Sequence, residues 1–318
     1  MTSGSNSGGG TYRAFLKVLK YILIIIVVYF AGKKLVTSWN EVITYDWVLN
    51  PYLLVLAILT HLLTFLLLAQ VWCFLISGFG YRINLRTAFK ISYIANLGRY
   101  IPGKVWQVFG MVYLAKKVNI KEEAAAASWG LAQMFAIPAA FLVGLVAIVW
   151  HPELLATEIS RFVGTGLYVA ILIVFVVSLL MIVAPNRTLL LFNVILKIFK
   201  RPPVTFQISK VTALKVYVGY FIAWAVFGLS FWLFARSIAG VIEFPVVAGI
   251  GAFVVSYQIG YLTVFSPGGL GVRELVLTSV MTAYLGPVAA GLAVASRLWN
   301  MISEIIAAII ALRIKLRT

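Results

Sequence analysis

The chain has 318 residues, of which 63% are hydrophobic and only 11% are charged, and its mean hydropathy is +1.03. A soluble globular chain is nearer half apolar and a quarter charged, so this composition excludes an ordinary soluble domain. The formal net charge of +17 suggests nucleic-acid binding. Most of the basic residues nevertheless fall in loops on one predicted side of a membrane, so we predict no nucleic-acid partner.

Apolar runs of about 20 residues recur along the sequence, which is the length that crosses roughly 30 Å of hydrocarbon as a helix. We predict an all-α integral membrane protein with about six full transmembrane helices and two re-entrant broken-helix pairs. Residues 1–12 are rich in Gly and Ser and are predicted to form a disordered tail. The first predicted full span is the apolar run that follows Arg13, Lys17 and Lys20 and ends at about Leu35, and the others cover about 51–76, 124–150, 163–183, 211–234 and 287–312.

Two proline–glycine breaks each divide an apolar stretch into two segments. Each of these segments is too short to span the membrane by itself. The first pair covers about 85–115 and breaks at Pro102-Gly103, and the second covers about 246–285 and breaks at Pro267-Gly268. Pro102 and Pro267 are about half a chain length apart. Paired interruptions at corresponding positions of two halves indicate the binding site of a transporter.

The order of the segments predicts an inverted-topology repeat. Residues 13–150 form the first membrane repeat and residues 163–318 the second, each with two spans, a broken pair and a further span. The distribution of the basic residues predicts that both termini lie on the cytoplasmic side. We expect the membrane to be the plasma membrane. The first broken pair then enters from the cytoplasm and the second from outside. A basic segment beginning near Arg187 is expected to be partly an amphipathic interfacial helix.

The chemistry of the breaks predicts an anion site. A half-helix that starts inside the membrane has N–H groups without partners and about half a positive charge at its end, which attracts phosphate. The bland alternative is a packed bend, with Arg99 and Lys104 reaching the cytoplasmic surface. The residues that we expect to bind the substrate at and beside the breaks are Arg99, Pro102, Gly103, Lys104, Pro267, Gly268, Gly269, Gly271, Arg273 and Glu274.

Polar residues of the last span extend this candidate site. Arg297, Asn300 and Glu304 share one helical face, which should face protein or water because a charge at the bilayer centre is costly. Glu304 is expected to pair with a site arginine, carry a coupling proton or contact a cationic head group. A purely structural pair of Glu304 with Arg297 or Arg273 is equally consistent with the sequence. Polar and aromatic residues near the breaks are candidates to line a wet cavity: Asn96, Tyr100, Trp106, Gln107, Tyr257, Gln258 and Tyr261.

Neither a metal nor a cofactor is predicted. Cys73 is the single cysteine, and His61 and His151 are far apart in the sequence without an acidic cluster. His61 lies within a predicted span, where we expect a packing histidine with satisfied hydrogen bonds rather than a functional one.

At its two breaks the sequence resembles the lysylphosphatidylglycerol synthase transmembrane family, which comprises flippase-like integral membrane proteins. The resemblance covers nearly the whole chain, and it implies the double re-entrant fold and movement of a lipid across the bilayer. Bifunctional members carry a soluble aminoacyl-transferase domain after the membrane region, so we expect here a stand-alone member without the synthase domain. The two stretches are Asn96-Leu97-Gly98-Arg99-Tyr100-Ile101-Pro102-Gly103-Lys104 and Ser266-Pro267-Gly268-Gly269-Leu270-Gly271-Val272-Arg273-Glu274.

The sequence leaves three functions open. The first is a lipid flippase or scramblase, not an enzyme, that moves a phosphate-bearing lipid through a cavity between the halves: a phospholipid, an aminoacyl phospholipid or a polyprenyl-phosphate glycolipid. No nucleotide-binding loop is visible, so we expect passive or ion-coupled transport. The second is a membrane-embedded transferase acting on a polyprenyl phosphate. The third is a partner subunit of a separate lipid-synthesising enzyme. Membrane lipids, such an enzyme and further copies of the chain are the candidate partners.

Overall fold

The computed structural model describes residues 39–100, 106–155, 165–198, 203, 208–240, 244–263 and 269–316. Within these ranges the secondary structure is helical, apart from one isolated bridge between Val48 and Ala239. The all-α prediction is therefore confirmed. The first predicted span and Pro102, Gly103, Lys104, Pro267 and Gly268 lie outside the described residues.

Four helices are long and apolar enough to cross a membrane: α3 (Pro51–Ser77), α6 (Glu122–Trp150), α10 (Lys210–Ala239) and α13 (Val288–Arg313). Each coincides with a predicted span. The start of α3 shows how the sequence sets such an end, because the Asn50 side chain accepts a hydrogen bond from the Leu53 N–H and Pro51 needs no partner for its nitrogen. Two short elements lie next to these long helices in the chain: α2 (Trp39–Thr44) before α3, and η2 (Pro152–Leu155) after α6.

A helix occupies the predicted span at 163–183, and a second helix follows it at a sharp angle, where the amphipathic segment near Arg187 was predicted. Helix α8 (Thr165–Val183) is followed after Ala184 by α9 (Pro185–Ile198), and their apolar portions meet at 111°. A proline at the start of α9 fits this bend, because its ring prevents the preceding helix from continuing. Counted as one span, the pair brings the candidate spans among the described residues to five.

Both broken pairs are present as short helices that return on themselves. The first consists of α4 (Leu85–Asn96), the 3-10 turn η1 (Leu97–Tyr100) and α5 (Trp106–Lys116). The second consists of α11 (Val246–Leu262) and α12 (Val272–Leu285). The two arms pack against each other in each pair, as a re-entrant segment requires.

Glycines allow the tight backbone approach at both breaks. Gly269 and Gly271 have φ values of +70° and +80°, in a region that residues with a side chain rarely adopt. A Cβ on Gly269 would lie 2.7 Å from the Gly260 carbonyl oxygen. A Cβ on Gly98 would likewise lie 2.7 Å from the Gln107 backbone nitrogen at the first break. Larger side chains at these positions would push apart the chain segments that form the breaks.

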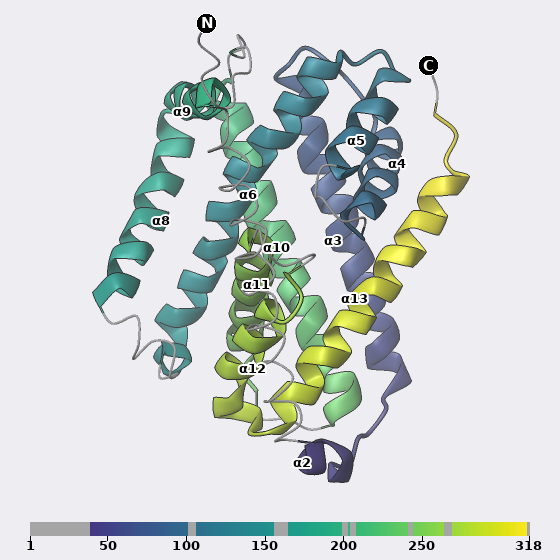
Figure 1. The fold of residues 1–318 in the computed structure, drawn as a ribbon, viewed down its shortest axis with the longest axis vertical. Coiled ribbons are helices and arrows are strands. Elements are labelled where there is room, and N and C mark those ends of the chain that lie inside the picture. The colour runs from purple at the N-terminus through teal and green to yellow at the C-terminus, as the bar shows by residue number, and fades with distance from the viewer. Residues whose placement is uncertain are drawn as a thin grey trace, which may run out of the picture.

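The same series of elements occurs twice in the described chain: a long helix, a broken pair and a long helix. Helices α3 and α10 pack side by side along much of their length in the centre of the bundle (Figure 1). The last helix of each series packs on the first broken helix of the other, α6 on α11 and α13 on α4. This reciprocal packing favours an inverted repeat, which stays a prediction, as do the repeat boundaries.

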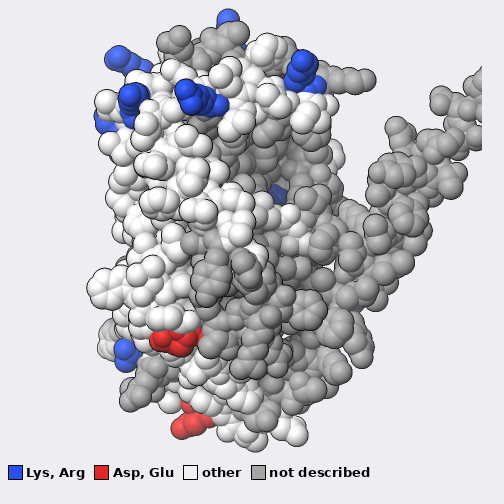
Figure 2. Space-filling model, turned by 90° about the vertical axis from the view of Figure 1, so that its left-hand side faces the viewer, with Lys and Arg blue, Asp and Glu red and all other residues white. Residues whose placement is uncertain are grey.

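Charge is distributed unequally between the two ends of the bundle. On the face shown in Figure 2, most Lys and Arg side chains gather at one end, and the visible Asp and Glu side chains lie towards the other. We call the first the basic end; it holds the loop between α3 and α4, the loop between α5 and α6, the start of α10 and the end of α13. This is the asymmetry on which the orientation prediction rests. The opposite end contains the start of α3 and the end of α10.

A candidate site at the two helix breaks

A cavity of about 180 Å³ lies inside the bundle, with walls from both broken pairs and from the four long helices, and polar groups are set in a largely apolar lining. Sites for drug-sized ligands are ~300–1,000 Å³, so this space suits a lipid head group and not a whole lipid. Figure 2 shows a basic side chain recessed in a hollow at mid-height. The polar lining consists of Thr64, Ser92, Tyr93, Asn96, Arg99, Gln107, Gln133, Tyr220, Tyr257, Gln258, Tyr261, Asn300 and Glu304.

Arg99 is the centre of a hydrogen-bond network in this cavity. Its Nη1 donates to Glu304 Oε1 at 2.8 Å and to the Tyr257 hydroxyl oxygen at 3.0 Å. Its Nε donates to Asn96 Oδ1 at 3.0 Å, and Gln107 Nε2 donates to the same oxygen at 2.9 Å. These contacts join α4, η1, α5, α11 and α13, so the arginine connects the first break to the second series of helices.

Glu304 is the carboxylate that neutralises Arg99. Its side chain is only 4% exposed, whereas that of Arg99 is 27% exposed. Asn300 Nδ2 donates a further hydrogen bond to Glu304 Oε1 at 3.0 Å. A buried carboxylate needs such donors, because charge that is taken out of water without partners costs several kcal/mol. The predicted shared face of Asn300 and Glu304 is confirmed, and the carboxylate faces the cavity.

Arg273 has no comparable neutralising partner. It is 5% exposed, and its guanidinium lies over the rings of Phe253 and Tyr257, at 4.8 and 5.0 Å from their centroids. Its Nη2 has no hydrogen-bond partner, and no ion pair of Arg273 exists among the described residues. Ring faces attract a cation by roughly 2 kcal/mol in a desolvated site, which falls short of a carboxylate. Arg273 is thus a buried cation adjacent to Tyr257, a wall of the cavity.

The start of α12 is partly occupied by the chain's own carboxylate. Glu274 Oε2 accepts a hydrogen bond from the Gly271 N–H at 2.8 Å, and its Oε1 accepts one from Arg297 Nη1 at 2.7 Å. A carboxylate at this position satisfies a free N–H group and complements the helix dipole. The half-helix end expected to bind phosphate therefore already holds an anion, and Arg273 beside it is the unmet positive group.

Two of the predicted pairings need correction. Arg297 pairs with Glu274, and Glu304 pairs with Arg99, so neither the Arg297–Glu304 nor the Arg273–Glu304 pair forms. Helical spacing placed Arg297 and Glu304 on one face, but two turns separate them along the axis. Each reaches a partner on a neighbouring element instead.

The expectation for His61 is wrong in one respect. The ring is fully buried between the aromatic side chains of Phe65, Phe227 and Trp299, as expected of a packing residue. Neither of its nitrogens, however, has a hydrogen-bond partner among the described residues. A buried imidazole without partners is costly, so its place in the core is not explained by packing alone.

The candidate residues fall into three groups in the structure. Arg99 and Glu304 lie in the cavity, and Arg273 lies directly behind its wall. Gly269, Gly271, Glu274 and Arg297 form the second break and its ion pair. Pro102, Gly103, Lys104, Pro267 and Gly268 lie outside the described residues.

The cavity contains some predicted lining residues and several that sequence reasoning missed. Asn96, Gln107, Tyr257, Gln258 and Tyr261 line it as expected, whereas Trp106 is absent from the lining and the side chain of Tyr100 is not described. Most of the missed residues come from the long helices, and their signal was a polar or aromatic group within an otherwise apolar span. They are Thr64, Trp72, Trp129, Gln133, Tyr220 and Trp224 of the long helices, with Ser92 and Tyr93 of α4.

Comparisons with known proteins place this architecture in a family. No curated protein matches the sequence. The model of the lysylphosphatidylglycerol synthase transmembrane region matches residues 17–311, which include the helices described above except for the last two residues of α13. The spans, the two breaks and the polar residues around them thus lie within one matched region, and the chain belongs to the lysylphosphatidylglycerol synthase transmembrane family.

Proposed function

We propose that the chain moves lipids with a phosphate-bearing, anionic head group from one leaflet of the membrane to the other. The head group would enter the cavity at Arg99, while the acyl or prenyl chains stay in the bilayer. The family is a membrane region linked to lipid handling, which supports a lipid as the cargo. The cavity volume supports binding of the head group alone.

The observation that carries the proposal is the excess positive charge around the breaks. In the described part of the chain, three arginines gather there (Arg99, Arg273 and Arg297), but only two carboxylates, Glu274 and Glu304. Both carboxylates are engaged in ion pairs, which leaves Arg273 without an anion. An uncompensated buried charge is strongly unfavourable, so a site of this kind favours an anionic ligand. A phosphate group accepts the bidentate hydrogen bonds that a guanidinium offers.

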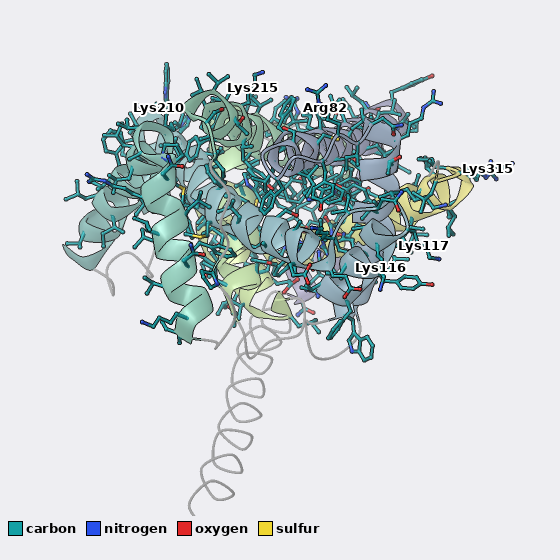
Figure 3. The ribbon with its side chains drawn as sticks, turned by 90° about the horizontal axis from the view of Figure 1, so that it is seen from above. Arg82, Lys116, Lys117, Lys210, Lys215 and Lys315 are labelled. Carbon is teal, nitrogen blue, oxygen red and sulfur yellow. The ribbon has the colours of Figure 1, made fainter. Side chains whose placement is uncertain are left out.

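The basic end supports an anionic cargo in a second way. Lysines and arginines there are spread around the outside of the bundle, where they would meet lipid head groups (Figure 3). Each adds ~1 kcal/mol of attraction to an anionic leaflet. The side chains labelled in that view are Arg82, Lys116, Lys117, Lys210, Lys215 and Lys315.

The proposal is tested by lipid translocation in liposomes that contain the purified protein. Fluorescent phosphatidylglycerol and a polyprenyl phosphate are compared with a sugar-headgroup lipid that lacks phosphate. We expect transport of the phosphate lipids by the wild type and its loss in Arg273→Ala. Arg236→Ala is the matched control, because Arg236 also lies over a ring, 5.0 Å from Trp232, but at the end of α10 outside the cavity.

Two results would decide against the proposal. Absence of phosphate-lipid transport by the wild type, with and without ion and pH gradients, would remove transport as the function. Normal transport by Arg273→Ala would remove that residue from the site. Incubation of the same protein with sugar donors and a polyprenyl phosphate tests the alternative that it is a transferase; we expect no product.

A further inference from the structure

An aromatic layer closes the cavity on the side away from the basic end. His61 on α3 packs on Trp299 of α13 at 4.5 Å and on Phe227 of α10 at 5.0 Å between ring centroids. Phe227 in turn packs on Phe253 of α11 at 4.9 Å, and Trp299 lies 6.2 Å from Phe253. Arg273 lies over Phe253 on the same layer. Four long or broken helices and the start of α12 therefore meet here.

The layer borders the cavity at Phe227, which also lines it, and His61 lies one helical turn beyond the lining. Along α3 the cavity lining runs from Trp72 back to Thr64, and His61 is the next turn towards the opposite end. Along α13, Trp299 directly precedes the lining residue Asn300. His61 is ~15 Å of helix from the start of α3, so the layer lies at mid-depth and not at the surface.

The polar atoms of the layer are left without partners. Both ring nitrogens of His61, the indole Nε1 of Trp299 and Nη2 of Arg273 are buried and make no hydrogen bond among the described residues. Buried polar groups in a stable core are almost always paired, so such a cluster indicates that its partner is absent from this state. The one orphaned acceptor nearby, Asn300 Oδ1, belongs to the cavity lining.

The unpaired groups define the chemistry of the missing partner. An indole N–H and a guanidinium can only donate hydrogen bonds, and a neutral imidazole offers one donor and one acceptor. A cluster of donors in a site of low dielectric fits an oxygen-rich anion, as in the binding of phosphate by arginines. It does not fit a cation or an aliphatic chain.

We propose that His61, Trp299 and Arg273 form a second station for the anionic head group, closed in this state and reached after the head group leaves Arg99. The inference rests on the proposed function and adds a second position on the path of the head group across the membrane. Separation of the His61 ring from the rings of Phe227 and Trp299 would open the station. The phosphate would then receive hydrogen bonds from His61, from Trp299 and from Arg273, on the far side of the layer.

The test uses His61→Phe and Trp299→Phe, which keep an aromatic ring and remove the donors. We expect both variants to unfold at or above the wild-type temperature, because an unpaired polar group is replaced by an apolar one. Phosphatidylglycerol should still raise the unfolding temperature of both variants, since the cavity is intact. Translocation of phosphatidylglycerol in liposomes should fall by about tenfold or more. His61→Gln should recover part of the rate, because an amide can donate to phosphate.

A matched tryptophan provides the control. Trp232 Nε1 already donates to the Phe244 carbonyl oxygen at 2.9 Å, outside the layer. Trp232→Phe should lower the unfolding temperature and leave the rate per folded molecule unchanged. Wild-type translocation rates in both His61→Phe and Trp299→Phe would show that the aromatic layer has only a packing role. That result would overturn the proposed second station. Loss of lipid binding together with transport would place both residues in the first site, which also overturns it. A wild type that binds and moves no phosphate lipid would overturn the proposed function itself.

Discussion

Arg99 and Arg273 lie beside the two breaks, yet their surroundings are opposite. Arg99 is partly exposed to the cavity and is held by Glu304, Asn96 and Tyr257. Arg273 is almost fully buried and is held by ring faces alone among the described residues. Tyr257 touches both, with its hydroxyl on one arginine and its ring on the other. Arg99 is therefore neutralised by a carboxylate of the chain, whereas Arg273 is a buried cation without a carboxylate partner among the described residues.

The difference follows from which carboxylate each arginine can reach. Glu304 extends from the last long helix to Arg99, and Glu274 is directed to the Gly271 N–H and Arg297. Both acids are thereby used, and Arg273 keeps its unpaired donor. We therefore expect Arg99 to stabilise the fold through Glu304 in addition to its proposed contact with the head group, whereas Arg273 should not stabilise the fold, and each expectation can be tested separately.

The largest expected effect is the removal of Arg99. Arg99→Met would leave Glu304 buried without a cation and should lower the free energy of unfolding by about 3 kcal/mol. The double variant Arg99→Met/Glu304→Leu should recover most of that loss, because two apolar side chains of similar size replace the pair. Denaturant unfolding in detergent measures both, as a double-mutant cycle. A double variant as unstable as the single one would show that the pair does not act as a unit.

A smaller effect of opposite sign is expected at Arg273. Arg273→Met removes a buried charge without a carboxylate and should raise the free energy of unfolding by about 1 kcal/mol. Arg236→Met, at a partly exposed arginine over Trp232, should change it by less than about 0.5 kcal/mol. The same unfolding experiment compares the two. Destabilisation of Arg273→Met as large as that of Arg99→Met would mean that Arg273 is structurally neutralised, and the contrast would disappear.

Much of this arrangement was predictable from the sequence, and the remainder has identifiable physical reasons. Apolar runs and proline–glycine breaks fix where helices begin and end, so α3, α6, α10, α13 and both broken pairs appear at the predicted positions. Hydrophobicity gives the end of the span at 183 but not the angle at Ala184, which depends on packing. The expected pairing of Glu304 with a site arginine is confirmed by Arg99, but ion pairs join residues far apart in the chain, so helical periodicity could not choose between Arg99 and the alternatives Arg297 and Arg273.

Glu153 is a carboxylate that is exposed to solvent, in contrast to the buried Glu304. At the end opposite the basic end its Oε1 lies 2.9 Å from His151 Nδ1 and accepts a hydrogen bond of 2.9 Å from the Tyr284 hydroxyl, which ties η2 to α12. A hydrogen bond from its own backbone N–H, followed by those from His151 and Tyr284, holds the pKa of Glu153 below its usual value. Like Glu304 it is engaged by partners from other elements, but it keeps contact with solvent.

Acidification should therefore weaken the hydrogen bonds that Glu153 accepts and lower the unfolding temperature slightly. Because the folded-state pKa of Glu153 is lowered, its contribution to stability is present above the usual value of about 4.3 and is lost as the pH falls through the lowered pKa. The unfolding temperature of Tyr284→Phe should lie below that of the wild type at pH 7 and approach it at pH 3. Added salt should weaken the exposed Lys116–Glu122 ion pair, since exposed charges are screened, and should leave the partly buried Arg99–Glu304 pair nearly unchanged. An equal salt response of both pairs would mean that burial contributes little to the Arg99 network, and the distinction between the two arginines would then rest on Arg273 alone.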